Sequence, residues 1–139
     1  MDGRRFVEIA QELIQGGTEG HYRAAAGRAY YGLLHEGWAA LKRWSIPQRP
    51  RESVHSFVRL RFTYAADKDL KKVGDIMDGL VQLRNQADYE LTTSGPFASP
   101  KRAEDAINSA LRAVTLLDTV EGDPVRTLSA IVANRKAFP

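Results

Sequence analysis

The chain has 139 residues and contains no cysteine. Disulfide bonds and thiolate metal sites are therefore excluded, as is typical of proteins of the reducing cytoplasm. Histidine is also scarce, and none of His21, His35 and His55 is followed three or four residues later by another metal ligand. Neither a P-loop nor a glycine-rich dinucleotide motif is present. We therefore expect neither a metal nor another cofactor.

Long apolar segments are missing as well. No apolar run is long enough to span a membrane. The first residues lead into an amphipathic segment that carries Glu8 and Glu12, which is unlike a signal peptide. Apolar residues make up 43% of the chain and charged residues 27%, a composition typical of a soluble globular domain rather than a disordered chain. The sequence thus predicts a cytoplasmic protein without membrane association.

Apolar residues recur at steps of three and four residues along most of the chain, which is the spacing of one face of a helix. Thr18, Asp67 and Asp123 are suited to cap helices that start directly after them. The pattern predicts helices at about 2–15, about 18–44 and 67 to about 89 or 91, helices that start at Ser99-Pro100 and at Asp123-Pro124, and a short helix opened by Pro50.

These signals predict an all-α protein with an up-and-down four-helix bundle as its core and additional short helices. Residues 1–120 would form the bundle. Residues 121–139 would form a C-terminal helical extension that packs on the same domain. No strand pattern and no internal repeat interrupts this reading of the sequence.

One arginine stands out because of its position in the apolar pattern of the fourth long segment. Leu70, Val73, Met77 and Leu80 repeat at steps of three and four residues, and continuing those steps leads to Arg84. A guanidinium cannot lose its charge, so on an apolar seam it needs either a side-chain partner or a bound anion such as phosphate. Asp88, one helical turn later, is a candidate partner.

Two further segments carry polar residues on otherwise apolar faces. Arg28 and His35 are two helical turns apart and face the same way, with Tyr31 between them. His55 lies in the short third helix. Two interpretations remain open: a buried polar network that ties the helices together, or a site for phosphate or an RNA backbone.

Basic residues gather between positions 42 and 61, where six Lys and Arg residues are opposed only by Glu52. Such a cluster can contact phosphates. It is explained equally well by a solvated face or by an acidic protein partner.

The polar segments together resemble the HEPN family (higher eukaryotes and prokaryotes nucleotide-binding domains). The resemblance depends on residues 28–35 (Arg-Ala-Tyr-Tyr-Gly-Leu-Leu-His), on the segment from His55 to Phe62, and on residues 83–89 (Leu-Arg-Asn-Gln-Ala-Asp-Tyr). It covers about residues 1–120 and is nearest to the small stand-alone bacterial and archaeal branch with an Arg-x-x-Ala-Asp-Tyr segment. The resemblance implies a four-helix bundle that pairs into a homodimer. Many family members are toxin-like or defence-associated ribonucleases, and others partner a nucleotidyltransferase or an antitoxin.

The family's nuclease signature is an arginine, a polar residue and, a few positions later, a histidine. Arg84 and Asn85 match its beginning, but Asp88 and Tyr89 stand where the histidine would be, and no histidine follows His55. RNA cleavage through the 2′-hydroxyl needs groups that exchange protons near neutral pH and a cation for the phosphorane. The departure therefore favours a binding module over an active nuclease.

Three functions follow from these observations. The first is a dimeric module that binds RNA or a nucleotide. The second is a metal-independent endoribonuclease in which another group replaces the histidine. The third is a non-catalytic antitoxin-like or adaptor protein whose polar residues are structural. The candidate ligand-binding residues are Arg28, Tyr31, His35, Arg84 and Asn85, and the candidate catalytic residues are Arg84, Asp88, Tyr89 and His55.

Overall fold

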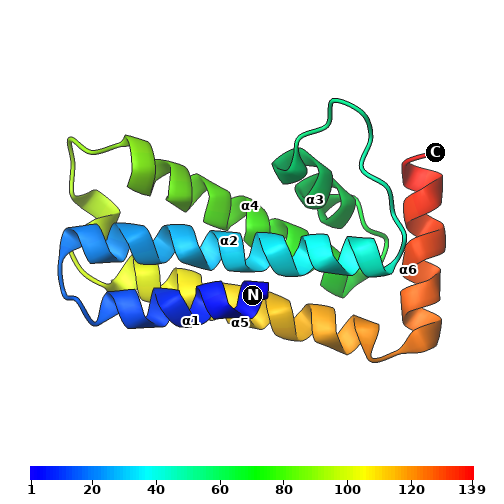
Figure 1. The fold of residues 1–139 in the computed structure, drawn as a ribbon, viewed down its shortest axis with the longest axis horizontal. Helices are drawn as coiled ribbons and strands as arrows, with labels where there is room; N and C mark the ends of the chain where they lie inside the picture. Colours follow the sequence, from blue (N-terminus) through cyan, green and yellow to red (C-terminus); the bar gives the residue numbers. More distant parts are fainter.

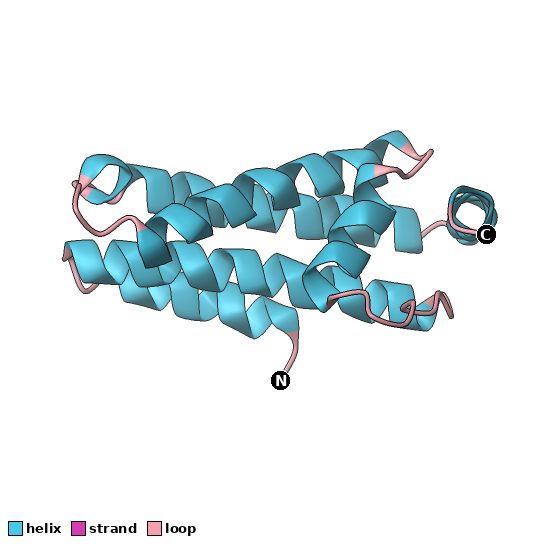
Figure 2. Ribbon diagram, turned by 90° about the horizontal axis from the view of Figure 1, so that it is seen from above, coloured by secondary structure: helices cyan, strands magenta, loops and turns pink.

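The computed structural model describes all residues from 1 to 139 and contains six α-helices, one short 3₁₀ turn and no β-strand. The prediction of an all-α protein is confirmed. The elements are α1 (Gly3–Ile14), α2 (Glu19–Arg43), α3 (Val54–Thr63), α4 (Lys68–Tyr89), η1 (Gly95–Phe97), α5 (Lys101–Glu121) and α6 (Pro124–Ala137). The helices α1, α2, α4 and α5 lie side by side and alternate in direction, which makes an up-and-down bundle (Figure 1; Figure 2).

Side-chain caps fix the start of most helices. Thr18, Asp67 and Asp123 each accept a hydrogen bond from a backbone N–H group two or three residues later, as the sequence predicts. Such a cap satisfies one of the backbone donors that have no partner within the first turn. The starts of α2, α4 and α6 can therefore be derived from local sequence alone.

Two predicted helix starts are wrong. The third helix begins at Val54 and not at Pro50, because Ser53 provides the cap by accepting from a backbone N–H group. The fifth helix begins at Lys101, so Pro100 occupies the cap position instead of the first helical position. Both differences are shifts along the chain that leave the order of elements unchanged.

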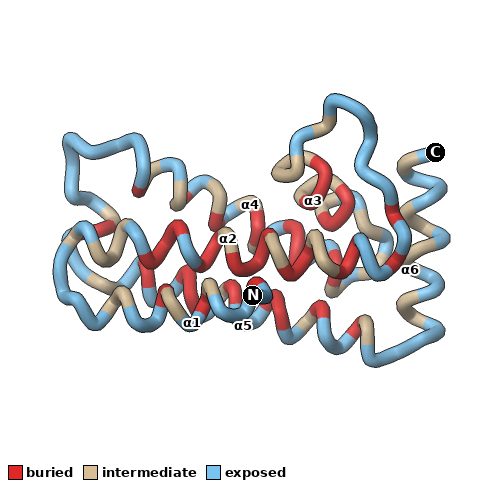
Figure 3. The backbone as a smooth tube through the Cα atoms, in the orientation of Figure 1, coloured by how far each residue is buried: buried red, intermediate tan, exposed pale blue.

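The core lies along the axis of the bundle, on the facing sides of the four long helices (Figure 3). In α4, the apolar stripe read from the sequence is buried: Leu70, Val73, Met77 and Leu80. In α5, small side chains form the buried face and permit a close approach of the neighbouring helices: Ala103, Ala106 and Ala110. None of the helices is both long enough and apolar enough to cross a membrane.

The last helix, α6, lies across the end of the bundle (Figure 1). Its Arg126 binds the carboxylates of Asp67 and Asp69 at 2.9 and 2.7 Å. The hydroxyl of Thr127 donates to the carbonyl of Val120 at 2.8 Å. No residue of α6 is buried, and several of its apolar side chains face solvent: Val125, Leu128 and Val132.

Candidate functional site

Arg84 lies beside the buried face of α4 and not on it. The buried line continues from Leu80 through Leu83 to Ala87, so the step after Leu80 is three residues rather than four. This corrects the expectation that the apolar seam runs through Arg84. The position still removes most of the side chain from solvent, of which 20% is exposed. Arg84 is therefore a cation at the border between core and surface.

The guanidinium of Arg84 contacts groups on two helices. One Nη donates to the hydroxyl of Tyr31 on α2 at 2.9 Å, and the other donates to Oδ1 of Asn85 at 3.3 Å. Nε lies 2.9 Å from a carboxylate oxygen of Asp88, which confirms the predicted pairing, although the oxygen is out of line with the N–H. The guanidinium carbon also lies 5.4 and 5.8 Å from the ring centres of Tyr31 and Tyr89.

His55 of α3 meets the two tyrosines of α2. Its Nδ1 is 2.6 Å from the hydroxyl of Tyr30, and the two rings stack with their centres 5.7 Å apart. The ring of Tyr31 meets His55 edge-on at 6.0 Å. Tyr31 therefore touches both His55 and Arg84. The structure brings together the polar residues of all three segments that the sequence singles out.

The protonation states of Tyr30 and His55 follow from their surroundings. Burial, and then the positive charges of Arg84 and Arg59 and the nearby His35, lower the pKa of His55 below its ordinary value of 6.5. Burial raises the pKa of Tyr30 to about 12. At pH 7 the imidazole is neutral, and the Tyr30 hydroxyl keeps its proton. That hydroxyl can donate to Nδ1 or accept from it, so either neutral tautomer of His55 is satisfied.

Arg28 and His35 share one face of α2, as their spacing predicts. Phe6 of α1 lies against both: the Arg28 guanidinium is 5.6 Å from the Phe6 ring centre, and the His35 ring stacks on Phe6 at 5.2 Å. Arg28 also lies 5.6 Å from the ring centre of Tyr31. The partial exposure of Phe6 beside two basic side chains depends on how α1 packs on α2.

The remaining candidates on α4 point to solvent. Asn85 is exposed, and 73% of Tyr89 is exposed. The Asp88 side chain is 42% exposed and is held in the ion pair with Arg84. Of the candidate acid or base groups, only His55 is partly buried and in contact with both Tyr30 and Tyr31.

The basic cluster between residues 42 and 61 is largely occupied by partners from its own chain. Three of its arginines bind carboxylates: Arg43 with Glu121, Arg59 with Asp78 and Arg61 with Glu52. Arg61 is buried, and it holds both carboxylate oxygens of Glu52 at 2.9 and 3.1 Å. These three arginines are therefore not open to phosphate, whereas Lys42 is exposed and has no carboxylate partner.

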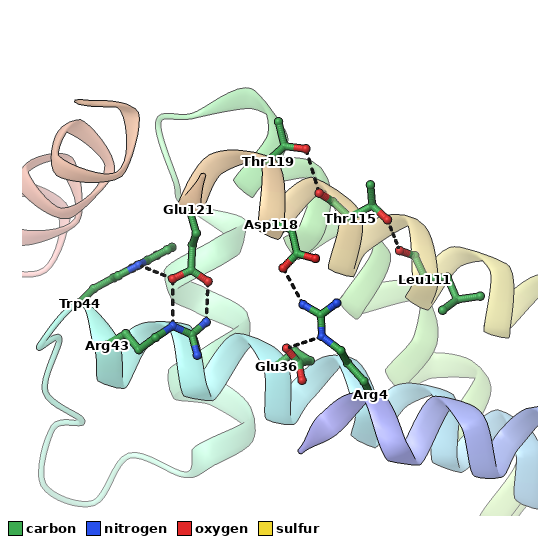
Figure 4. Close-up of polar contacts among 9 residues, drawn as sticks. All are labelled: Arg4, Glu36, Arg43, Trp44, Leu111, Thr115, Asp118, Thr119 and Glu121. Atoms are coloured by element: carbon green, nitrogen blue, oxygen red, sulfur yellow. Dashed lines mark hydrogen bonds and ion pairs between the residues drawn. The ribbon is translucent and has the colours of Figure 1, made fainter. Parts of the chain in front are cut away.

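A groove of about 640 Å³ opens beside His35, and the sequence analysis missed it. Trp38 and Lys42 line its α2 side, and the Lys42 ammonium lies 4.2 Å from the Trp38 ring centre. The far wall comes from α5, where Asp118 accepts from Arg4 of α1 at 2.6 Å and Glu121 accepts from Arg43 of α2 (Figure 4). The sequence contains one sign of this groove: Trp38 and Lys42 follow His35 at the spacing of one face of α2.

Arg23 is a second residue that the sequence analysis missed. Its guanidinium pairs with Glu19 at 3.0 Å. It also donates to four backbone carbonyls at the end of α4 and in the following loop: Gln86, Ala87, Glu90 and Thr93. The carbonyls of Ala87, Glu90 and Thr93 have no backbone donor, so Arg23 satisfies them, whereas the carbonyl of Gln86 also accepts from the N–H of Glu90. Arg23 therefore fixes the position of the segment that carries Arg84.

Comparison with protein-family models, with curated proteins and with solved structures finds no significant match to this chain. We therefore infer function from the geometry of the site. The partly exposed guanidinium of Arg84 lies near the rings of Tyr31 and Tyr89. The neutral imidazole of His55 contacts the ring of Tyr31. Such a cation can bind a phosphate oxygen, and the imidazole can exchange a proton near neutral pH.

Proposed function

We propose that this chain is a HEPN-type helical module that binds RNA or a nucleotide, with Arg84 in contact with a phosphate group. The observation that carries the proposal is the surroundings of Arg84. Its charge is opposed only by Asp88, whose side chain is itself substantially exposed, and its second helix contact is the uncharged hydroxyl of Tyr31. A phosphate that approaches from solvent can replace these contacts with stronger charge-assisted hydrogen bonds.

The direct test is the affinity of the purified protein for a labelled RNA oligonucleotide, measured by fluorescence anisotropy at several salt concentrations. The affinity should fall with rising salt, because phosphate contacts release counterions. Arg84→Ala should weaken binding. Arg112→Ala is the matched control, since Arg112 is exposed on α5 and forms no ion pair. Binding that is undetectable, independent of salt or equal in the two variants would remove the proposal.

The adaptor interpretation makes a different prediction about Arg84. A purely structural arginine should leave a buried partner unpaired when it is removed, at a cost of about 3–5 kcal/mol. Asp88 is too exposed for that, so Arg84→Ala should lower the free energy of unfolding by only about 1 kcal/mol. Thermal unfolding followed by circular dichroism separates the two values. A loss of several kcal/mol would favour the adaptor.

One observation favours metal-independent RNA cleavage as a second function: His55 is neutral at pH 7 and touches the tyrosine that contacts Arg84. A neutral imidazole can act as a general base and the guanidinium can stabilise the phosphorane.

The cleavage assay uses a pool of cellular RNA in EDTA. Under this hypothesis, activity is lost in Arg84→Ala and in His55→Ala but not in the control His21→Ala, which lies in the first turn of α2 beside its cap. Asp88→Asn and Tyr89→Phe complete the set. If wild-type cleavage survives each of His55→Ala, Asp88→Asn and Tyr89→Phe, none of these residues is the acid or base.

The proposal also includes a homodimer, which the family resemblance implies. Light scattering at micromolar concentration measures the mass directly. A mass near 15.5 kDa, that of one chain, would contradict the dimer. The proposed contact between Arg84 and phosphate does not depend on that result.

A further inference from the structure

Helix α2 carries a line of five side chains that are exposed or partly exposed: Arg28, Tyr31, His35, Trp38 and Lys42. The steps between them are three, four, three and four residues, so they lie on one face of the helix. We call this line the α2 track. It contains two cations at its ends, three rings between them and no carboxylate.

The side chains of the track touch one another nearly without a break. Arg28 lies 5.6 Å from the ring centre of Tyr31. The ring of His35 is 6.1 Å from that of Trp38, over which Lys42 lies at 4.2 Å. Phe6 of α1 joins the two halves, because it contacts Arg28 on one side and stacks on His35 on the other.

The track is continuous with the site described above. Tyr31 receives the hydrogen bond from Arg84 at 2.9 Å, which places a third cation at the first end of the line. At the other end, His35, Trp38 and Lys42 open into the groove beside α5. Four carboxylates also line the groove. Asp118 and Glu36 share Arg4, at 2.6 and 3.6 Å, and Glu121 is held by Arg43 and Trp44 (Figure 4). Asp2 caps α1 by accepting from the backbone N–H of Arg5.

We propose that the α2 track binds a single-stranded RNA segment, which starts with a phosphate at Arg84 and runs along α2 to Lys42. Aromatic rings with interspersed cations are the recurring means by which proteins hold single strands, because bases stack on the rings and phosphates contact the cations. The inference rests on the proposed function and extends it, since it names the class of ligand and adds Phe6, Trp38 and Lys42 to its site.

The length of the track sets the length of the ligand. From Arg28 to Lys42 the helix rises by about 21 Å. With stacked bases spaced about 3.4 Å apart, this distance corresponds to about six nucleotides. Base stacking of this kind tolerates any sequence, because every base has a flat face. The track should therefore bind short single strands with little preference for sequence.

A second copy of the chain is the alternative occupant of such a line. In a two-fold symmetric pair, the track of one copy would face the same track of the other. With Arg28 and Lys42 at its ends and no carboxylate on it, either direction of pairing would bring cations against cations. The charge of the track therefore favours a polyanion, and a dimer of this chain would use another face.

The first experiment measures the affinity of the full chain for labelled oligouridylates of two, four, six and eight nucleotides by fluorescence anisotropy. Affinity should rise up to a length of about six nucleotides and then level off. Trp38→Ala should weaken hexanucleotide binding about fivefold or more, while Trp38→Phe keeps most of it. Lys42→Ala should reduce the slope of log affinity against log salt by about 0.7.

Two variants away from the track serve as matched controls. Tyr64→Ala removes an aromatic ring of which 65% is exposed, and Lys72→Ala removes an exposed cation of α4. Neither should change the affinity or its salt dependence. Circular dichroism of each variant checks that it is folded.

Tryptophan fluorescence supplies an independent reading, because the chain has only two tryptophans. In a Trp44→Phe background, all tryptophan emission comes from Trp38, and stacking of a base on this ring should quench it. In a Trp38→Phe background the emission comes from the buried Trp44 and should change little.

The outcomes separate this inference from the function on which it rests. If no oligonucleotide binds the wild type at low salt, both fail. If binding depends on Arg84 but not on length, Trp38 or Lys42, the track is overturned and the phosphate contact at Arg84 remains. If Trp38→Ala changes the mass measured by light scattering and leaves RNA affinity unchanged, the track is a protein interface and the inference is wrong.

Discussion

Gly74 lies where α4 makes a close approach to the end of α3. A Cβ atom at this position would be 2.5 Å from the backbone nitrogen of Thr63 and 2.7 Å from the carbonyl carbon of Phe62. These are backbone atoms, so no change of rotamer can move them away. Gly79 offers a control in the same helix, because it is exposed and a Cβ there would have no atom within 4 Å.

The two substitutions to alanine should change stability in opposite directions. Alanine is favoured over glycine inside a helix by about 1 kcal/mol, and this gain applies equally at both positions. Forcing extra volume into a packed interface costs about 1–3 kcal/mol. We expect a steric cost of about 3 kcal/mol at Gly74, because its neighbours are backbone atoms that cannot move aside. Gly74→Ala should therefore lower the free energy of unfolding by about 2 kcal/mol, and Gly79→Ala should raise it by about 1 kcal/mol.

Urea unfolding followed by circular dichroism measures both values against the wild type. The difference of about 3 kcal/mol between the two variants isolates the steric cost, because the helix propensity cancels. In thermal melts it corresponds to roughly 10 °C for a chain of this size. Equal free energies of unfolding for Gly74→Ala and Gly79→Ala would refute the packing of α3 against α4.

Three further predictions concern the polar contacts. Arg61→Met should lower the free energy of unfolding, measured in urea, by about 3 kcal/mol, because it leaves the partly buried carboxylate of Glu52 without its partner. Adding Glu52→Gln should restore part of this free energy. Arg23→Met should speed amide exchange at the end of α4 and lower the free energy of unfolding by about 2 kcal/mol, since the carbonyls of Ala87, Glu90 and Thr93 lose their donor. Wild-type stability should fall as the pH drops through 6.5, where an unfolded chain takes up the proton that His55 resists in the folded state. His55→Asn keeps a hydrogen-bonding group beside Tyr30 and should lose less stability than the wild type over that pH range. The same pH dependence in variant and wild type would contradict the lowered pKa of His55.

Features that depend on neighbours along the chain could be predicted from the sequence. The caps Thr18, Asp67 and Asp123 and the ion pair between Arg84 and Asp88 all lie within a few residues of their partners. The one error on α4 is also local. A helix turn of 3.6 residues allows a step of either three or four after a buried position, and local spacing does not choose between Leu83 and Arg84.

Features that depend on contacts between helices could not be predicted. The spacing of Tyr30 assigns it to the core, and it is buried, yet its hydroxyl finds His55 twenty-five residues away. Arg23 has no local feature that distinguishes it from a surface arginine, although it binds carbonyls more than sixty residues away. The basic cluster appears open in the sequence because the carboxylates that bind Arg43 and Arg59 come from later helices.

The environments of three arginines explain why we propose a phosphate contact at Arg84 and not at the others. Arg61 has 1% of its side chain exposed and holds a carboxylate with two hydrogen bonds, so a ligand can neither reach it nor improve on its partner. Arg23 is 11% exposed, and three of the carbonyls to which it donates would be left unsatisfied if it moved. Arg84 is 20% exposed, and its partners are a hydroxyl, an amide and a carboxylate that water can solvate once they are released. The cost of exchanging partners is thus lowest at Arg84, and a phosphate offers it more charge than the groups it now contacts.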